Sequence, residues 1–152
     1  MKLTDLVKPD YILPQVKATT KRALLSELSA FAALKTGVDQ PFLFETLLER
    51  EQLGTTGIGG GVALPHGRLP KLDKIYGFLA KLNTPIAFES VDKQPVDLIF
   101  LLLSPEKAGA DHLKALALMA RFLKNPDAVQ RIRGAETAEG IFAVLEECRD
   151  SE

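Results

Sequence analysis

The chain contains two histidines, His66 and His112, and the first follows a glycine-rich stretch and a proline. Histidine has an ordinary pKa of about 6.5, so its neutral ring can act as a nucleophile or base at neutral pH without special activation. Pro65 restrains the approach to His66, and Gly67 has no side chain to obstruct a partner. A purely structural histidine in a turn is the alternative. We interpret His66 as a residue that accepts a phosphoryl group and passes it on.

The second histidine, His112, is expected at the start of a largely buried helix over residues 112–124, with Asp111 as a possible N-cap. The partial positive charge of a helix N-terminus disfavours the imidazolium form. A neutral His112 could therefore donate one N–H group to an anion. A core histidine that only packs is the alternative, because its helix face continues with apolar residues. The distance between the two histidines does not follow from the sequence.

The glycine-rich segment GTTGIGGG, residues 54–61, leads to His66. It lacks the lysine of a phosphate-binding P-loop, and its helix–loop–strand order is the reverse of a dinucleotide-binding fingerprint. A flexible turn is one interpretation, and a nest of backbone N–H groups that binds an anion is the other. Its position before His66 favours the nest, with four residues expected to contact phosphate: Thr55, Thr56, Gly57 and Gly59.

Composition narrows the class of protein. The 152 residues are 46% hydrophobic and 26% charged, which is typical of a globular protein, so we expect one domain spanning residues 1–152. A net charge of −1 argues against a nucleic-acid-binding protein. The widely spaced His66, His112 and Cys148 form no metal-ligand cluster and allow no internal disulfide. We expect no metal and no cofactor.

The apolar runs are short. None approaches the roughly 20 residues of a membrane span, and the first ten residues lack the apolar centre of a signal peptide. A single cysteine is typical of a reducing compartment. The sequence therefore predicts a cytoplasmic protein that is not inserted in a membrane.

Apolar periodicity predicts helices and strands that are mixed but do not strictly alternate. Helices are expected between a cap at Thr19 or Thr20 and Gly37, from Asp39 or Gln40 to Gly54, and over residues 112–124, 127–133 and 137–148. Strands are expected over residues 11–13, 75–82 and 96–103, with another at 86–88 after a turn at 83–85. The run VDLIFLLL is typical of a central strand covered on both faces. The fold class is α/β, with a mixed sheet of about four to six strands flanked by helices.

Three segments in order carry a family resemblance: LLEREQLGTTGIGGGVALPHG, TPIAFESVDKQPVDLIFLLLSP and DHLKALALMARFL. They resemble the fructose/mannitol-type (type 2) enzyme IIA of the bacterial phosphotransferase system, and the nitrogen-regulatory branch most closely. The resemblance implies a mixed five-stranded sheet flanked by helices. It also implies that His66 is phosphorylated, that His112 donates a hydrogen bond to the phosphoryl group, and that Arg50 stabilises charge. We expect the tele nitrogen of His66 to be the acceptor, although the sequence does not distinguish the two ring nitrogens.

The resemblance implies a histidine-phosphorylated phosphocarrier that accepts phosphate from an HPr-like carrier and regulates partner proteins by its phosphorylation state. A free-standing IIA that passes phosphate to a IIB component of a sugar transporter is the alternative. A protein-binding module without catalysis is a third possibility, and a small hydrolase lacks a nucleophile or a metal. Two departures from the family pattern lie in the loop: Thr55-Thr56 replaces the common Ser-Thr, and Gly59 to Gly61 are consecutive glycines.

Overall fold

Strand β6 (Val96–Pro105) lies at the centre of the fold, as its apolar run predicts. The structure is a computed structural model that describes residues 1–148. Alternate residues of β6 belong to two separate hydrophobic clusters, one containing Leu98, Phe100 and Leu102 and the other Ile99, Leu101 and Leu103. All six side chains are fully buried. The prediction of a central strand covered on both faces is confirmed.

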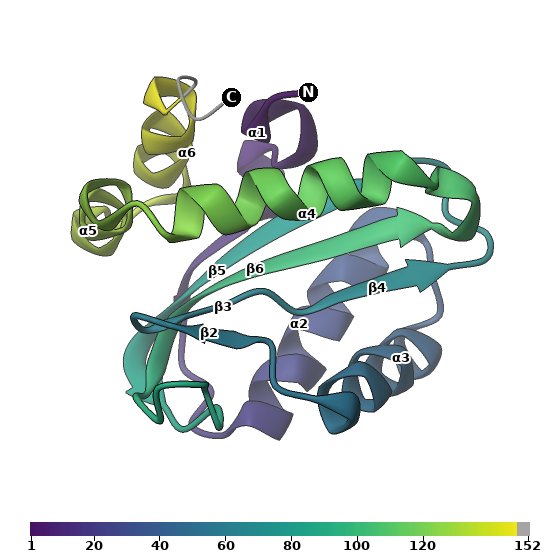
Figure 1. Cartoon of the computed structure of the whole chain (residues 1–152), viewed down its shortest axis with the longest axis horizontal. Helices are drawn as coiled ribbons and strands as arrows, with labels where there is room; N and C mark the ends of the chain where they lie inside the picture. The colour runs from purple at the N-terminus through teal and green to yellow at the C-terminus, as the bar shows by residue number, and fades with distance from the viewer. Residues whose placement is uncertain (149–152) are drawn as a thin grey trace.

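Six strands form one mixed sheet (Figure 1). The order is β1 (Ile12–Val16), β5 (Tyr76–Ile86), β6, β3 (Val62–Ala63) and β2 (Gly57–Gly59), and β4 (His66–Leu69) pairs with the later part of β6. Strands β3 and β4 run parallel to β6, whereas β5 runs antiparallel to it. The fold class predicted from the sequence, a mixed sheet flanked by helices, is confirmed.

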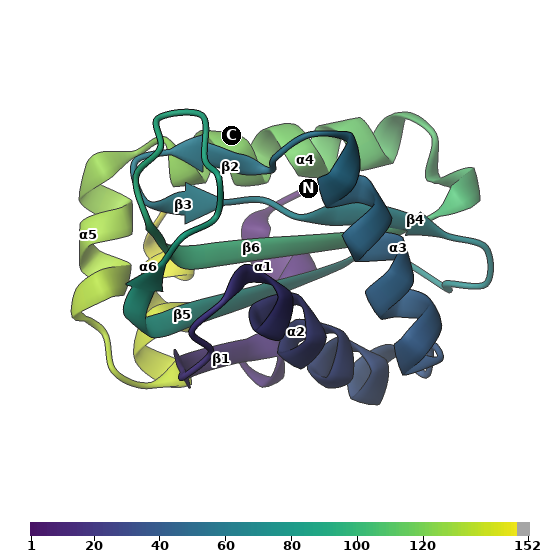
Figure 2. The same cartoon turned by 90° about the horizontal axis from the view of Figure 1, so that it is seen from below.

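Helices cover both faces of the sheet (Figures 1 and 2). One face is covered by α1 (Leu3–Leu6), α4 (Ala110–Leu123), α5 (Pro126–Gly134) and α6 (Ala138–Glu147). The other face is covered by α2 (Lys21–Thr36) and α3 (Gln40–Leu53). Short 3₁₀ turns at Pro9–Tyr11 and Glu106–Ala108 connect elements. Within residues 1–148, no helix is long and apolar enough to cross a membrane.

The ends of α2 and α3 follow the predicted signals. The side chains of Thr20 and Asp39 accept hydrogen bonds from free N–H groups of the first turns, and Gly37 ends α2 with a φ of 77°. The predicted Asp111 cap of α4 is wrong. Gly109, with a φ of 59°, is the N-cap, and Asp111 lies inside the first turn. The chain enters α4 from the preceding 3₁₀ turn through this backbone conformation, which favours glycine.

Strand β5 differs from its prediction. The sequence predicts a turn at residues 83–85 between two strands, but β5 continues through this segment to Ile86. Its pairing with β6 shifts register between Lys81 and Ile86. A proline lacks an N–H donor, and a strand tolerates it at such an irregularity, so Pro85 does not end the strand. Turn residues therefore mark a register shift here.

The glycine-rich segment forms a hairpin. Strand β2 pairs antiparallel with β3, and Gly60 and Gly61 connect them with φ values of 70° and 80°. A two-residue hairpin turn favours glycines because both residues adopt positive φ. Strand β3 then pairs with Leu98 and Ile99 of β6, and β4 pairs further along the same strand. The hairpin thus guides the chain onto β6 before it reaches His66.

Candidate functional site

His66 is the first residue of β4, and strand pairing determines its position. It lies opposite Leu102 of β6, whose N–H donates to the carbonyl of Pro65 at 3.0 Å. The ring of His66 is half-buried, and its Nδ1 lies 2.9 Å from the carbonyl oxygen of Leu64. A carbonyl oxygen only accepts hydrogen bonds, so Nδ1 carries the proton. The lone pair of the neutral ring is therefore on Nε2, the tele nitrogen.

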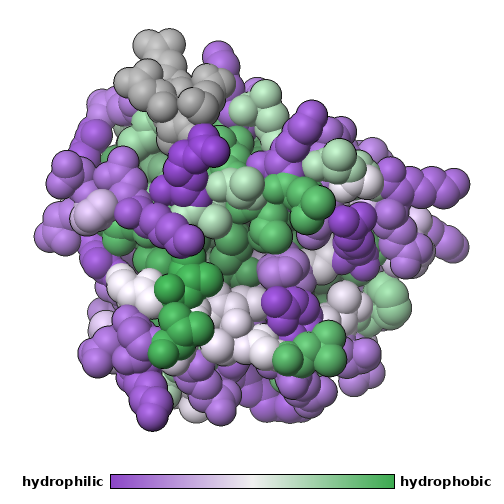
Figure 3. Space-filling view, viewed as in Figure 1, coloured by the Kyte–Doolittle hydropathy of each residue, from purple (hydrophilic) through white to green (hydrophobic). Residues whose placement is uncertain are grey.

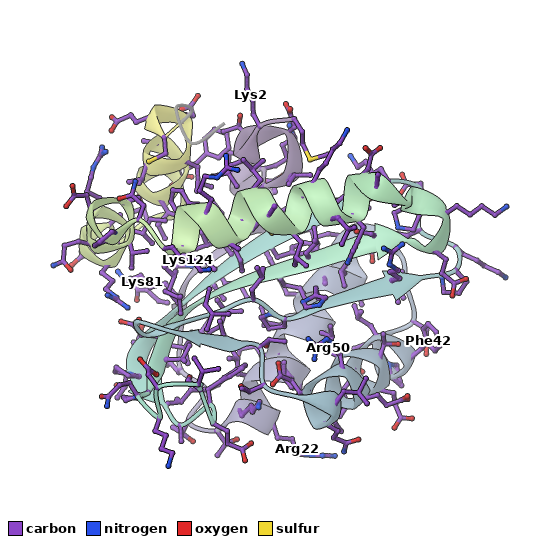
Figure 4. All side chains as sticks on the ribbon, viewed as in Figure 1. Lys2, Arg22, Phe42, Arg50, Lys81 and Lys124 are labelled. Atoms are coloured by element: carbon purple, nitrogen blue, oxygen red, sulfur yellow. The ribbon has the colours of Figure 1, made fainter. Side chains whose placement is uncertain are left out.

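Arg50 lies in the last turn of α3 and contacts this nitrogen. Its Nε is 3.3 Å from Nε2 of His66, in donor geometry. A second guanidinium nitrogen donates to the carbonyl oxygen of Gly54 at 2.9 Å. Figure 4 shows the side chain extending from α3 toward the sheet. Both acceptors are neutral, and Arg50 forms no ion pair with another residue in the described part of the chain.

His112 is brought beside His66 by α4. The centres of the two rings are 6.0 Å apart, although 46 positions separate the residues in the sequence (112 minus 66). His112 is buried, and its Nδ1 lies 2.7 Å from Oγ of the fully buried Ser104. The structure thus brings together the three residues expected to be catalytic: Arg50, His66 and His112. We refer to them as the histidine cluster.

Burial lowers the pKa of both histidines. For His66, desolvation is the largest cause; the Leu64 carbonyl raises the pKa, Arg50 lowers it, and Glu51 raises it. For His112, desolvation again dominates, and Arg68 and His66 lower the pKa further. Because both pKa values lie below the ordinary 6.5, both rings are neutral at pH 7. A neutral His66 is a competent nucleophile.

The loop residues expected to contact phosphate use their donors inside the protein. The Thr55 hydroxyl donates to the carbonyl of Phe88 and accepts from the N–H of Gly57. The buried Thr56 donates both its hydroxyl and its N–H to the carboxylate of Glu51. The structure therefore does not place Thr55, Thr56 or the Gly57 N–H as donors to a phosphoryl group on His66.

Gly59 lies in the hairpin rather than beside the histidines. Its nearest side chains are those of Val91 and Asp92. At the adjoining turn, Arg133 binds Asp97 through two nitrogens and also donates to the carbonyl of Gly60. The consecutive glycines let the turn form and let the Arg133 side chain approach closely; the guanidinium is 2.5 Å from where a Cβ of residue 61 would lie.

A buried charge pair explains why the loop is structural. Lys21 and Glu51 are 2.7 Å apart, with side chains only 18% and 4% exposed. Glu51 also accepts from Thr56, whose carbonyl accepts from the N–H of Leu64. We call Lys21, Glu51 and Thr56 the loop network. It joins α2 and α3 to the segment that leads to His66. The cation that pairs with Glu51, Lys21, comes from a different helix.

Three functional candidates were missed by sequence analysis. Arg68 lies two residues beyond His66 in β4, on the same side of the strand, and its charge acts on His112. This period-two spacing is a signal that could have identified it. Arg68 forms no ion pair with any residue from 1 to 148. Leu53 and Leu113, which are 86% and 62% exposed, are the other two candidates.

These residues line an open depression around the histidine cluster. Its volume is about 530 Å³, and its lining includes Arg50, Leu53, His66, Arg68, His112 and Leu113. Figure 3 shows apolar side chains interspersed with polar ones on this face of the molecule. Within residues 1–148, no group of three or more histidine, cysteine or carboxylate side chains could hold a metal ion. The site offers a nucleophilic nitrogen that carries no proton, cationic donors and an exposed apolar rim.

Comparison with protein families finds one match along most of the chain. Residues 5–148 match the family described as "Phosphoenolpyruvate-dependent sugar phosphotransferase system, EIIA 2". A nitrogen regulatory protein of Bradyrhizobium diazoefficiens is 56% identical over 145 residues, which cover 95% of each chain. A fructose-specific EIIA component from Haloferax volcanii is 33% identical over 109 residues, covering 72% of this chain and 71% of that protein.

A solved structure has the same fold as this chain. The nitrogen regulatory protein IIA-Ntr from Neisseria meningitidis aligns with a TM-score of 0.89 and 30% sequence identity. The alignment covers 94% of this chain and 98% of the other. The relatives named as nitrogen regulatory proteins are thus similar both in sequence and in structure.

Proposed function

The chain belongs to the EIIA 2 family of the phosphoenolpyruvate-dependent phosphotransferase system, and from this we propose that it is a phosphocarrier modified on Nε2 of His66. The observation that carries the proposal is the unprotonated state of that nitrogen, which accepts a hydrogen bond from Nε of Arg50 at 3.3 Å and lies beside His112. The donor is a phosphohistidine on an HPr-like carrier protein. The phosphorylation state of His66 then controls binding to partner proteins.

The transfer is a substitution at phosphorus between two imidazoles. The Nε2 lone pair of His66 forms the new N–P bond while the N–P bond of the carrier breaks and its electron pair returns to the carrier nitrogen. Nδ1–H stays bonded to the Leu64 carbonyl throughout. Since phosphoryl transfer has a loose transition state, the protein need only position the groups and stabilise charge.

Charge stabilisation comes from groups already at the site. When the lone pair of His66 forms the N–P bond, it no longer accepts from Nε of Arg50, and this donor turns to a phosphoryl oxygen. The hydrogen bond to the Gly54 carbonyl keeps the guanidinium in place. His112 donates to a second oxygen, and Arg68 adds positive charge from β4. Both arginines are available because no carboxylate in the described residues pairs with them. Donors arranged before reaction are worth more than mobile ones.

The exposed apolar rim, Leu53 and Leu113, favours the proposal that this site binds a partner protein. Leu53 and Leu113 are exposed at the border of the depression that contains the histidines, where a partner protein could bury them. A phosphoryl group would place a charge of about −1.5 to −2 beside these side chains, by analogy with phosphoserine. A partner that binds the neutral apolar rim would then be released, or one with a basic surface recruited.

A regulatory role is favoured over sugar transport by the similarity to nitrogen regulatory proteins, at 56% identity against 33% for the fructose-specific component. The second candidate function, transfer to a IIB component, uses the same site. Incubating the phosphorylated protein with a purified IIB domain and following the phosphate separates the two roles.

The proposal is tested by the mass of the intact protein after incubation with phosphoenolpyruvate, enzyme I and an HPr-like carrier. We expect one acid-labile phosphoryl group on the wild type, none on His66→Ala, and slower transfer to His112→Ala. Circular dichroism verifies that each variant is folded. Absence of phosphate on folded wild type, with a carrier that phosphorylates another IIA protein, would leave only a binding module. Phosphate that persists on His66→Ala would move the site elsewhere.

A further inference from the structure

Ser104 has no assigned role, yet it is the residue that contacts His112 from within the core. It lies near the end of β6, opposite Arg68 of β4, and its side chain is fully buried. Its Oγ is 2.7 Å from Nδ1 of His112. This is its only side-chain hydrogen bond to a residue in the described part of the chain. No sequence motif surrounds Ser104, so its proximity to His112 comes from the fold.

The direction of this hydrogen bond follows from the burial of both groups. A hydroxyl has one hydrogen, and a buried hydroxyl without an acceptor is disfavoured. If Nδ1 of His112 donated to Ser104, the hydroxyl hydrogen would have no acceptor among residues 1–148. If the hydroxyl donates to Nδ1, both groups are satisfied and the ring proton lies on Nε2.

We propose that Ser104 is a positioning residue that holds His112 in the tautomer with its proton on Nε2. His66 has the opposite tautomer, because the Leu64 carbonyl holds its proton on Nδ1. The two adjacent rings, 6.0 Å apart, therefore have complementary roles: Nε2 of His66 accepts, and Nε2–H of His112 donates. A carbonyl and a hydroxyl, both from the core, determine these roles.

The consequence for catalysis rests on the proposed function. A phosphoryl group on His66 carries negative oxygens, which an N–H of His112 stabilises and a ring lone pair would repel. Without the Ser104 hydroxyl, both tautomers of His112 become populated, and only the Nε2–H tautomer can donate to the phosphoryl group. For histidines that bind a metal, removing the partner that orients the ring typically lowers affinity or activity 10- to 100-fold, and we use this range as the guide here. We expect Ser104→Ala to slow phosphoryl transfer about tenfold, at the lower end of this range.

Nitrogen NMR of the histidine rings tests the tautomers directly, without any carrier. The chain has two histidines, so the spectrum contains two rings, and His112→Gln identifies which is which. In the wild type at about pH 7.5 we expect Nε2–H for His112 and Nδ1–H for His66. A wild-type His112 with its proton on Nδ1 would overturn the proposal, and this result does not depend on how any variant folds.

Variants test whether Ser104 is the cause. Ser104→Ala should give a mixture of tautomers at His112, and Ser104→Thr, which keeps the hydroxyl, should restore the Nε2–H form. Ser90→Ala is the matched control, because Ser90 is also buried but its Oγ has no hydrogen-bond partner among residues 1–148. An unchanged His112 spectrum in a folded Ser104→Ala protein would show that Ser104 only fills space.

The same variants separate this proposal from the proposed function. If the wild type is not phosphorylated but the spectra behave as expected, the phosphocarrier role fails and the role of Ser104 stands. If the wild type is phosphorylated and Ser104→Ala is phosphorylated equally fast with an unchanged spectrum, the role of Ser104 fails and the phosphocarrier role stands.

Discussion

The cations around residues 54–66 fall into two groups that differ in their partners. In the loop network and at the hairpin turn, each cation faces a carboxylate: Lys21 pairs with Glu51, and Arg133 with Asp97. In the histidine cluster, the hydrogen bonds of Arg50 to residues 1–148 go to a ring nitrogen and a carbonyl, both neutral. A cation that is already paired with a carboxylate attracts a further anion less strongly, because the carboxylate offsets its charge. The phosphate site is therefore expected where the cation lacks a carboxylate, rather than where the glycines are most numerous.

The largest expected effect is the difference in phosphoryl-transfer rate between variants of Arg50 and Arg133. Arg50→Ala should lower the rate of phosphoryl transfer about a hundredfold, because it removes a donor directed at Nε2 of His66. Arg133→Ala should leave the rate unchanged and lower the free energy of unfolding by roughly 1–2 kcal/mol, because it removes the bonds to Asp97 and Gly60. Carrier-dependent phosphorylation rates and urea unfolding of both variants measure the contrast. Equal rate losses would remove the distinction between the two regions.

A smaller effect is expected from the loop. Thr56→Val keeps the shape of the side chain but removes the buried hydroxyl bonded to Glu51. Because this hydrogen bond joins a charged acceptor, the free energy of unfolding should fall by about 2 kcal/mol. The phosphorylation rate should change less than about threefold, since the geometry directs no Thr56 donor at His66. A rate loss comparable with that of Arg50→Ala would restore the loop as a phosphate contact; Thr55→Val provides the matched control.

The smallest effect concerns pH. Burial lowers the pKa of His66 and His112 below the ordinary 6.5, so between 6.5 and the folded-state pKa the unfolded chain binds more protons than the folded chain. The free energy of unfolding should therefore be highest above pH 6.5 and should decrease as the pH falls below it. The double variant His66→Gln/His112→Gln should lose less stability over this range. Urea unfolding at about pH 7.5 and 5.5 measures this, and equal losses would contradict it.

Features that depend on neighbouring residues were predictable from the sequence. The Thr20 and Asp39 caps, the stop at Gly37 and the buried strand β6 all follow from local hydrogen bonds or apolar periodicity. Local signals failed where a longer-range partner decided the outcome. Residues 83–85 continue strand β5, because pairing with β6 holds them on both sides of the register shift.

The identity of the candidate site residues came from the sequence, but their geometry came from the fold. The Pro65-His66-Gly67 motif, Arg50 and His112 were identified by type, position and family resemblance. Sequence could not show that strand register and α4 bring the two rings to 6.0 Å, because that distance depends on segments far apart in the chain.

The contacts of the glycine-rich loop and the protonation of the two rings became visible only in the folded structure. From the sequence, Thr55 and Thr56 are expected to donate hydrogen bonds to phosphate. In the structure, their hydroxyls donate to the Phe88 carbonyl and to Glu51 instead. The ring nitrogen that holds the lone pair is determined by the Leu64 carbonyl, and the proton of His112 is assigned through Ser104. The sequence determined which groups are available for chemistry. Folding determined which of them a ligand can reach, because a donor held by a carboxylate or a carbonyl inside the protein is not available to a ligand.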